Sequence, residues 1–133
     1  MINTKARKRT CTGAVGLLLL LVYASTALGH VVTTPKVVGS AKAGRSVFSS
    51  TCAVCHTLKA AGAVGIIGPN LDKVAPKLSE ALIIKAVASG GASIMTQATR
   101  SKYTTQMSAY KGTLTATQIT NVAAFIYTTT HRT

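Results

Sequence analysis

The sequence has very few acidic residues, few aromatic residues and an odd number of cysteines, and each shortage excludes a class of protein. Only 2 of its 133 residues are acidic, so Asp72 and Glu80 are the only source of a catalytic carboxylate pair. There is no Trp, and 4 Tyr and 2 Phe supply little for a conventional apolar core. Three Cys cannot all pair, which argues against a small disulfide-built domain. With 13% charged residues, a long exposed coiled coil is also excluded.

The first 29 residues have the pattern of an export segment. Residues 5–9 hold four basic side chains, residues 14–23 are apolar, and the small residues at 25–27 suit a signal peptidase. Because residues 10–29 carry no charge, the same stretch could instead remain as a membrane anchor. We therefore expect a signal peptide or an N-terminal membrane anchor at 1–29. The rest of the chain would then lie in the periplasm or on the outer face of the cytoplasmic membrane, rather than in a thylakoid lumen.

If the chain is exported, its formal net charge of +13 indicates different partners from those of a cytoplasmic protein. Beyond Gly29 the chain keeps 11 of its 15 Lys and Arg and both acidic residues. In the cytoplasm such a surplus would suggest nucleic acid, which we exclude as a partner of an exported domain. Outside the membrane it favours proteins with acidic docking faces, or anionic lipid headgroups. The lysines are spread along the chain, so a generally solubilising surface is the alternative.

The exported part divides into a linker at 30–39, which contains Pro35, and a domain at 40–133. We predict three helices in the domain. The first begins at Ser40 and carries a stripe at Gly44, Val47, Phe48, Thr51, Cys52 and Cys55. The second runs from Ser79 to about Ala88 and presents Leu82, Ile83, Ala86 and Val87. The third opens with a capping box and presents Ile119, Val122, Ala123, Phe125 and Ile126.

Residues 59–69 and 91–113 contain glycines and no helical period, so we expect long loops there. No alternating run is long enough to require a sheet. The predicted fold class is therefore all-α, with short helices and long loops. Three short helices bury little apolar surface, and a domain of this kind needs a further stabilising element.

The motif that bears chemistry is Cys52-Ala53-Val54-Cys55-His56, the C-x-x-C-H signature of covalent haem attachment. The two cysteines lie about one helical turn apart, so both thiols can reach the vinyl groups on one edge of a porphyrin. His56 follows directly and can offer its imidazole to the iron. One haem c bound through Cys52 and Cys55 would also supply the missing core.

Three other interpretations of this motif fit less well. A zinc knuckle needs two more ligands, and the remaining candidates Cys11, His30 and His131 lie near the ends of the chain. A thioredoxin-type redox pair needs a βαβ setting that the helical pattern lacks. A structural disulfide between Cys52 and Cys55 would close too short a loop to stabilise much.

With these residues, the sequence from Ser40 to Thr128 resembles the class I cytochromes c, the small monohaem type. Gly44 and Phe48 precede Cys52 at the family's spacing. The resemblance implies a small class I cytochrome c fold wrapped around the haem. In it, Gly44 and Phe48 would pack against Val122 and Phe125 of the last helix.

The resemblance also implies the remaining site residues. Gly68-Pro69-Asn70-Leu71 is similar to the family's proximal segment, in which the Pro69 carbonyl would accept the His56 N–H and Leu71 would pack on the haem. The segment that begins at Met107 resembles the distal-ligand segment, although it has Ser108 where Pro is frequent. His56 and Met107 would therefore be the iron ligands. Met95, which follows Gly90-Gly91, is the alternative distal ligand, although a lone Met is more commonly an apolar plug.

No Ser-His-Asp arrangement or nucleophile elbow is visible, and two axial ligands leave no open position on the iron, so we predict a protein that is not an enzyme. By resemblance, it is a monomeric one-electron carrier between a quinol-oxidising complex and a terminal oxidase. The alternatives are a haem c subunit or sensor domain of a larger complex, and a photosynthetic electron carrier. The expected partners are redox proteins with acidic docking faces, and a membrane could be reached through the N-terminal segment.

Overall fold

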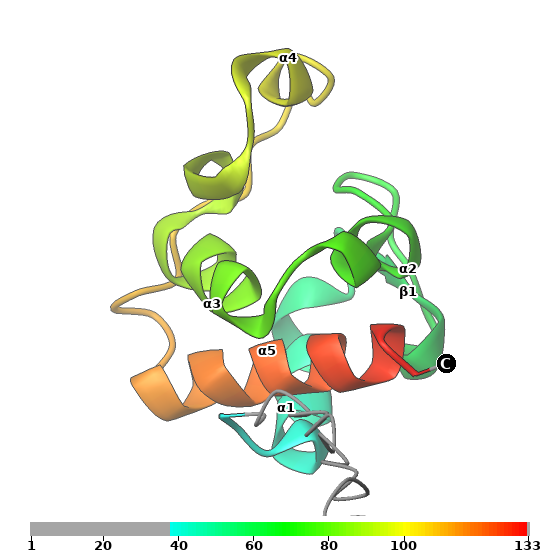
Figure 1. Cartoon of the computed structure of the whole chain (residues 1–133), viewed down its shortest axis with the longest axis vertical. Helices are drawn as coiled ribbons and strands as arrows, with labels where there is room; N and C mark the ends of the chain where they lie inside the picture. The colour runs from blue at the N-terminus through cyan, green and yellow to red at the C-terminus, as the bar shows by residue number, and fades with distance from the viewer. Residues whose placement is uncertain (1–37, 133) are drawn as a thin grey trace, which may run out of the picture. The chain divides into compact units, whose positions relative to one another are not determined.

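The structure, a computed structural model, describes residues 38–132. The predicted leader at 1–29 and residues 30–37 of the predicted linker lie outside the described residues. In chain order the elements are α1 (Ala41–Val47), the π-helical turn η1 (Phe48–Cys52), β1 (Thr57–Leu58), the 3₁₀ turn η2 (Lys59–Ala61), β2 (Ala63–Val64), α2 (Leu71–Val74), η3 (Ala75–Lys77), α3 (Glu80–Ser89), η4 (Gly91–Ile94), α4 (Gln97–Arg100) and α5 (Ala116–Thr130). This confirms the predicted helical class with long loops (Figure 1).

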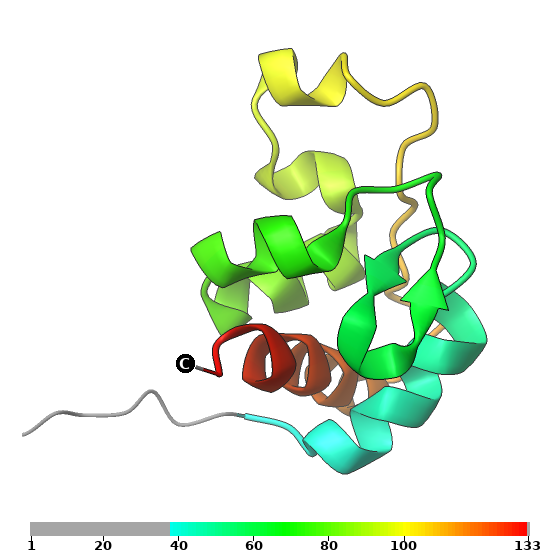
Figure 2. The ribbon, with the colours of Figure 1, turned by 90° about the vertical axis from the view of Figure 1, so that its right-hand side faces the viewer.

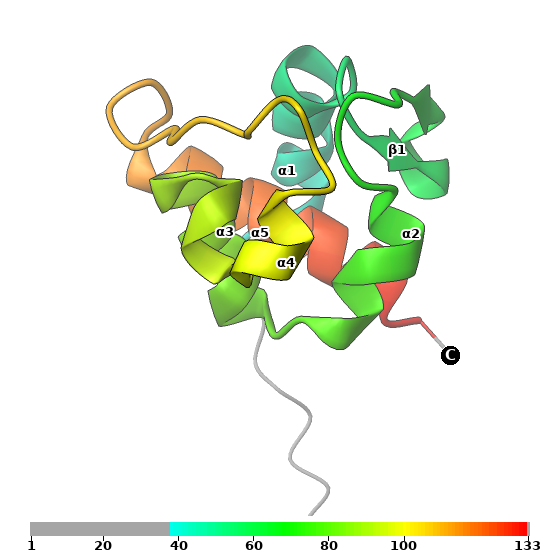
Figure 3. The same ribbon diagram turned by 90° about the horizontal axis from the view of Figure 1, so that it is seen from above.

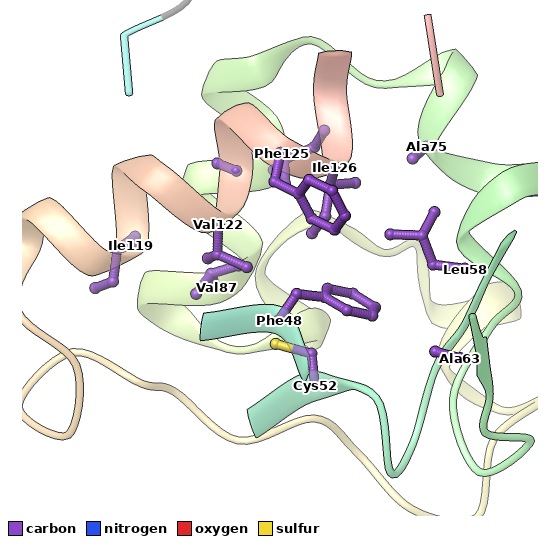
Figure 4. Close-up of a cluster of buried hydrophobic side chains, with 12 residues drawn as sticks. Phe48, Cys52, Leu58, Ala63, Ala75, Val87, Ile119, Val122, Phe125 and Ile126 are labelled. Atoms are coloured by element: carbon purple, nitrogen blue, oxygen red, sulfur yellow. The ribbon is translucent and has the colours of Figure 1, made fainter. Parts of the chain in front are cut away.

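The crossing of α1 and α5 organises the core (Figure 1). Gly44 is buried in this crossing, where an added Cβ would lie 2.9 Å from the Cβ of Phe125 and would overlap the carbonyl of Asn121. Next to this crossing, the rings of Phe48 and Phe125 pack against each other, with their centroids 5.8 Å apart and an angle of 59° between the ring planes (Figure 4). Val122 is fully buried beside them. A glycine on α1 therefore allows the helices to approach closely enough for these two rings to meet.

The helices begin at the caps that the sequence predicts. The hydroxyl of Ser40 accepts the N–H of Ala43, and that of Ser79 accepts the N–H of Leu82, both at 3.3 Å. Thr115 forms the predicted capping box with Gln118. Each cap satisfies backbone N–H groups that the first turn of a helix leaves without a partner. Local sequence therefore sets where all three long helices start.

The middle of the chain differs from the prediction in three ways. The loop after the haem motif contains a two-stranded antiparallel hairpin, in which Thr57 pairs with Val64 and Leu58 with Ala63. A short helix, α2, follows it, and α4 interrupts the segment expected to be irregular. Strands of two residues and helices of one turn are too short to produce a hydrophobic period, so pattern reasoning could not detect them.

The prediction of which α3 residues are buried was also partly wrong. Ile83 and Val87 are buried, as expected, but Leu82 is 39% exposed. Residues 83 and 87 are one helical turn apart and share a face, whereas Leu82 is rotated by about 100° from Ile83 and turns outward. The buried face is therefore narrower than the prediction.

Helices α3, α4 and α5 are separated in the sequence but belong to the same part of the fold. Helices α3 and α5 pack together, and Figure 2 shows α4 set apart from α5 beyond η4. From α4 the chain returns past α3 to the start of α5 (Figure 3). None of the helices within residues 38–132 combines the length and apolarity needed to cross a membrane.

Candidate haem site

The haem motif lies at the end of the first helical stretch, where the backbone changes from α1 to a π-helical turn. The N–H of Ala53 bonds to the carbonyl of Phe48, and the N–H groups of Cys55 and His56 both bond to the carbonyl of Cys52, at 3.1 and 3.0 Å. These bonds hold the two cysteines and the histidine in one tight turn. The π-helical turn just before it, closed by the Ala53–Phe48 bond, is of a type that is frequent at functional sites.

His56 is buried and held from two sides. Its Nδ1 lies 2.9 Å from the carbonyl oxygen of Pro69. Gly68 packs flat against the ring, since an added Cβ would lie 2.8 Å from the same Nδ1. The N–H of Gly68 in turn bonds to the carbonyl of Cys55 at 2.8 Å. The proximal segment predicted from the resemblance thus lies directly beside the imidazole.

Met107 lies against Gly90 and Gly91, the two glycines that follow α3. Gly90 has φ 87°, a conformation that favours glycine, and an added Cβ there would lie 2.8 Å from the Met107 carbonyl. The N–H of Gly91 donates to that carbonyl at 3.1 Å. Further along, the N–H groups of Tyr110 and Lys111 bond to the carbonyls of Val87 and Ala88. The C-terminal end of α3 therefore fixes the loop that carries Met107.

One cavity of about 670 Å³ receives all the predicted site residues. The residues concerned are Cys52, Cys55, His56, Pro69, Leu71 and Met107. Its volume lies within the usual range of about 300–1,000 Å³ for pockets that hold organic ligands or cofactors. Its wall is mainly apolar and includes Phe48, Ile83, Val87 and Ile126. A covalent haem requires two thiols, one imidazole and one thioether, and the apolar cavity offers these and a second thioether, that of Met95, so the residues present fit that group.

Burial raises the pKa of the Cys52 thiol to about 11, and the neighbouring Cys55 adds to the effect. A raised thiol pKa means that the protonated, weakly nucleophilic form predominates at neutral pH. Cys52 therefore carries no activated thiolate of the kind that catalytic cysteines use. Cys52 also lines the cavity, where its thiol can reach a bound group.

Sequence reasoning missed the wall of the cavity opposite the haem motif. This wall comes from η4, α4 and the loop after them, and includes Ile94, Met95, Thr99, Tyr103 and Gln106. The segment has no periodic pattern, and only the preceding Gly90-Gly91 pair indicated that the chain turns there. Of these residues, the sequence indicates only Met95, as the alternative distal ligand or an apolar side chain.

Comparison with known proteins identifies the family. The family model described as "Cytochrome c" matches residues 41–130, and the chain belongs to this family. It is a class I, small monohaem cytochrome c with a covalently attached haem c, and its Cys52 and Cys55 lie in the haem-binding region.

Two curated relatives agree with this assignment. A protein named cytochrome c6 from Rippkaea orientalis is 38% identical over 110 residues, which cover 82% of this chain and 86% of that protein. A protein named cytochrome c-553-like from Synechocystis is 44% identical over 52 residues, or 39% of this chain and 47% of that protein. These similarities support a small haem protein that carries electrons.

A solved structure supports the fold. The c-type cytochrome SorU from Sinorhizobium meliloti superposes with a TM-score of 0.51 at 30% identity, covering 69% of this chain and 92% of that one. The predicted small class I cytochrome c fold is therefore confirmed. Proteins of this family are as a rule electron carriers rather than enzymes.

Proposed function

We propose that the protein is a one-electron carrier of an exported respiratory chain, which takes electrons from a quinol-oxidising complex and delivers them to a terminal oxidase. The observation that carries the proposal is that His56 and Met107 reach one cavity from different segments of the chain. The imidazole of His56 and the thioether of Met107 would hold the iron of a bound haem and would leave no open position for a substrate. Outer-sphere electron transfer is the chemistry that remains.

The residues around the cavity have distinct roles in this proposal. Cys52 and Cys55 attach the haem, which when bound supplies a one-electron couple. Nδ1–H of His56 donates to the carbonyl of Pro69, which leaves Nε2 as the ligand atom and makes the imidazole a stronger donor. Leu71 lines the cavity, where its apolar side chain would pack on the haem.

The thioether of Met107 favours the reduced state and raises the potential, as a carrier that delivers electrons to an oxidase requires. Its loop is anchored by backbone hydrogen bonds to the end of α3 rather than by exposed side chains. Such an anchor keeps the ligand in place through each change of charge. A small structural change on electron transfer is what a fast carrier needs.

The surface near the haem motif is suited to a protein partner. Val54, Val64 and Ile66 are 73%, 81% and 89% exposed. They lie close together, because β2 pairs with the strand after the motif and an added Cβ on Gly65 would lie 2.7 Å from the Ala53 carbonyl oxygen. Exposed apolar side chains that cluster in this way mark interaction sites.

The charges of the domain complement an acidic partner. The carboxylate of Asp72 accepts the N–H of Lys59 at 2.9 Å, and that of Glu80 accepts the N–H of Val38 at 3.1 Å. Both acidic residues of the chain are thus bonded to its own backbone, whereas the side chains of Lys59 and Lys111 are exposed. We propose that these lysines lie beside the haem edge and steer acidic docking faces toward it.

The proposal also covers the organisation of the chain. Residues 1–29 act as a leader or anchor, 30–39 as a linker, and 40–133 as a monomeric carrier domain outside the cytoplasmic membrane. A retained anchor would confine the carrier near membrane complexes, whereas cleavage would release it to diffuse.

Reconstitution tests this function. The haem-loaded protein is mixed with a quinol-oxidising complex and a terminal oxidase, and oxygen uptake is followed while its concentration is varied. We expect uptake to depend on the protein, and the reduced protein to keep its spectrum under carbon monoxide. A rapid carbon monoxide adduct would indicate an open iron and favour a sensor or an enzyme. Transfer to a photosynthetic reaction centre but not to the oxidase would reject the respiratory placement.

A further inference from the structure

We propose that Met95 is a reserve thioether ligand, which takes the distal position on the iron when Met107 is released. The inference rests on the proposed function, since it requires a haem in the cavity and Met107 as the resting ligand. A closed site needs one thioether, yet the cavity is lined by two. The structure places this second thioether, that of Met95, in the same cavity as the first.

The side chains of Met95 and Met107 converge on the same glycine. A Cβ placed on Gly91 would lie 4.0 Å from the sulfur of Met107 and 3.8 Å from the terminal methyl carbon of Met95. Because Gly91 has no side chain, nothing at that position separates the two thioethers. Both residues line the cavity that also contains His56.

Met95 does not serve as an ordinary core residue. Methionine commonly fills gaps in apolar cores. Among the described residues, Met107 packs against the buried core cluster, but Met95 belongs neither to that cluster nor to the partly buried shell around it. It is half-buried against the cavity instead. Its side chain is therefore available to a group in the cavity.

The segment that carries Met95 is held mainly by local hydrogen bonds. The N–H of Met95 bonds to the carbonyl of Ala92 at 3.4 Å, and Arg100 Nε donates to the Met95 carbonyl at 3.2 Å. The amide of Gln106 donates to the carbonyls of Arg100 and Tyr103. The bonds of Met95 itself stay within residues 92–100, and within residues 38–132 the one bond from this segment to α3 is an exposed one, from the Ser93 hydroxyl to the Lys85 carbonyl at 3.3 Å. Met95 can therefore shift without breaking a buried hydrogen bond to α3 or α5.

The exchange breaks one sulfur–iron bond and forms another. Both thioethers are neutral, so no proton or electron moves and the charge of the site is unchanged. The effect is to keep the distal position closed to oxygen and peroxide while Met107 is away from the iron. An electron carrier would then not acquire an open coordination position through the loss of one ligand.

The test uses the haem-loaded protein and four groups of variants. Met107→Leu and Met107→Ala remove the resting ligand, and Leu keeps the volume that packs the loop. Each is combined with Met95→Leu, which conserves volume and removes the second sulfur. The matched control combines each with Ile94→Leu, a volume-conserving change at the neighbouring residue, which also lines the cavity. Met95→Leu is also made alone.

Two readouts are taken from the ferric proteins: the weak long-wavelength sulfur-to-iron absorption band and the affinity for cyanide. We expect the band to persist when only Met107 is replaced, to survive the Ile94→Leu control, and to vanish when Met95→Leu is added. If Met95 holds the position in nine of ten molecules, adding Met95→Leu tightens cyanide binding about ten-fold.

The inference is overturned if neither Met107 variant keeps the band and cyanide binds equally well with and without Met95. That outcome would leave Met107 as the resting ligand and the proposed function intact. A wild-type protein without the band, or loss of the band on Met95→Leu alone, would instead contradict the assignment of Met107. The two failures are therefore distinguishable.

Discussion

Nδ1 of His56 lies 2.9 Å from the carbonyl oxygen of Pro69, 13 residues further along the chain. A carbonyl can only accept, so Nδ1 carries the proton and Nε2 has a free lone pair for the iron. The contact depends on Gly68, whose backbone lies against the imidazole. A hydrogen bond between a histidine and a distant carbonyl thus links the haem motif to the proximal loop.

Gly68→Ala is expected to disturb this contact. The added methyl would lie 2.8 Å from Nδ1 and 2.5 Å from Cε1, so the ring must move. We expect the variant to lose about 1–3 kcal/mol of stability and to shift the absorption spectrum of the haem-loaded protein. Denaturant unfolding and spectroscopy measure the two effects.

Gly62→Asn is the matched control for this change. Gly62 has φ 70°, which Asn tolerates, and no atom lies close to an added Cβ. Its stability should change by no more than about 0.5 kcal/mol. If Gly68→Ala behaves like this control, the imidazole is not held by the proximal loop as described.

Gly44→Ala is expected to separate α1 from α5. The new methyl would lie 2.9 Å from the Cβ of Phe125 and would overlap the Asn121 carbonyl, both of which belong to a packed helix. We expect a loss of about 1–3 kcal/mol in the free energy of unfolding. Ser46→Ala, on the exposed side of the same helix, should not destabilise the protein. Equal stability of the two variants would show that the crossing does not require glycine.

Lys59→Gln is expected to slow transfer to an acidic partner. Removal of one steering charge should lower the association rate at low ionic strength by roughly two-fold and weaken its dependence on salt. Lys42→Gln is the control, because Lys42 lies at the start of α1, ten residues from Cys52 and about 15 Å away along a helix of that length. Stopped-flow kinetics at several salt concentrations measure both. Rates that do not respond to ionic strength would reject electrostatic steering.

The parts of the fold that follow from local chemistry could be predicted from the sequence. Ser40, Ser79 and Thr115 cap their helices as expected, because a hydroxyl at that position satisfies the first N–H groups. The C-x-x-C-H motif could be interpreted because its residue types and spacing together allow little other chemistry. Resemblance then supplied Pro69 and Met107, which the structure brings to the same cavity.

The remaining parts depend on contacts that no local pattern encodes. The hairpin that pairs Thr57 with Val64 is too short for alternation to show. Met95 and Met107 both lie close to Gly91, the first residue of η4, and this convergence depends on tertiary packing rather than on periodicity. Leu82 turned outward because a narrow helix crossing buries fewer positions than a broad stripe suggests.

Mass spectrometry of the mature chain, produced in a host able to attach haem, tests the central claim most directly. The account predicts the mass of one added haem that survives acid–acetone extraction, and its loss from the protein in which Cys52 and Cys55 are both replaced by Ala. The double variant should also be largely unfolded, because the haem supplies much of the buried apolar surface of the domain. A chain without haem, or with haem that the solvent extracts, would contradict the account.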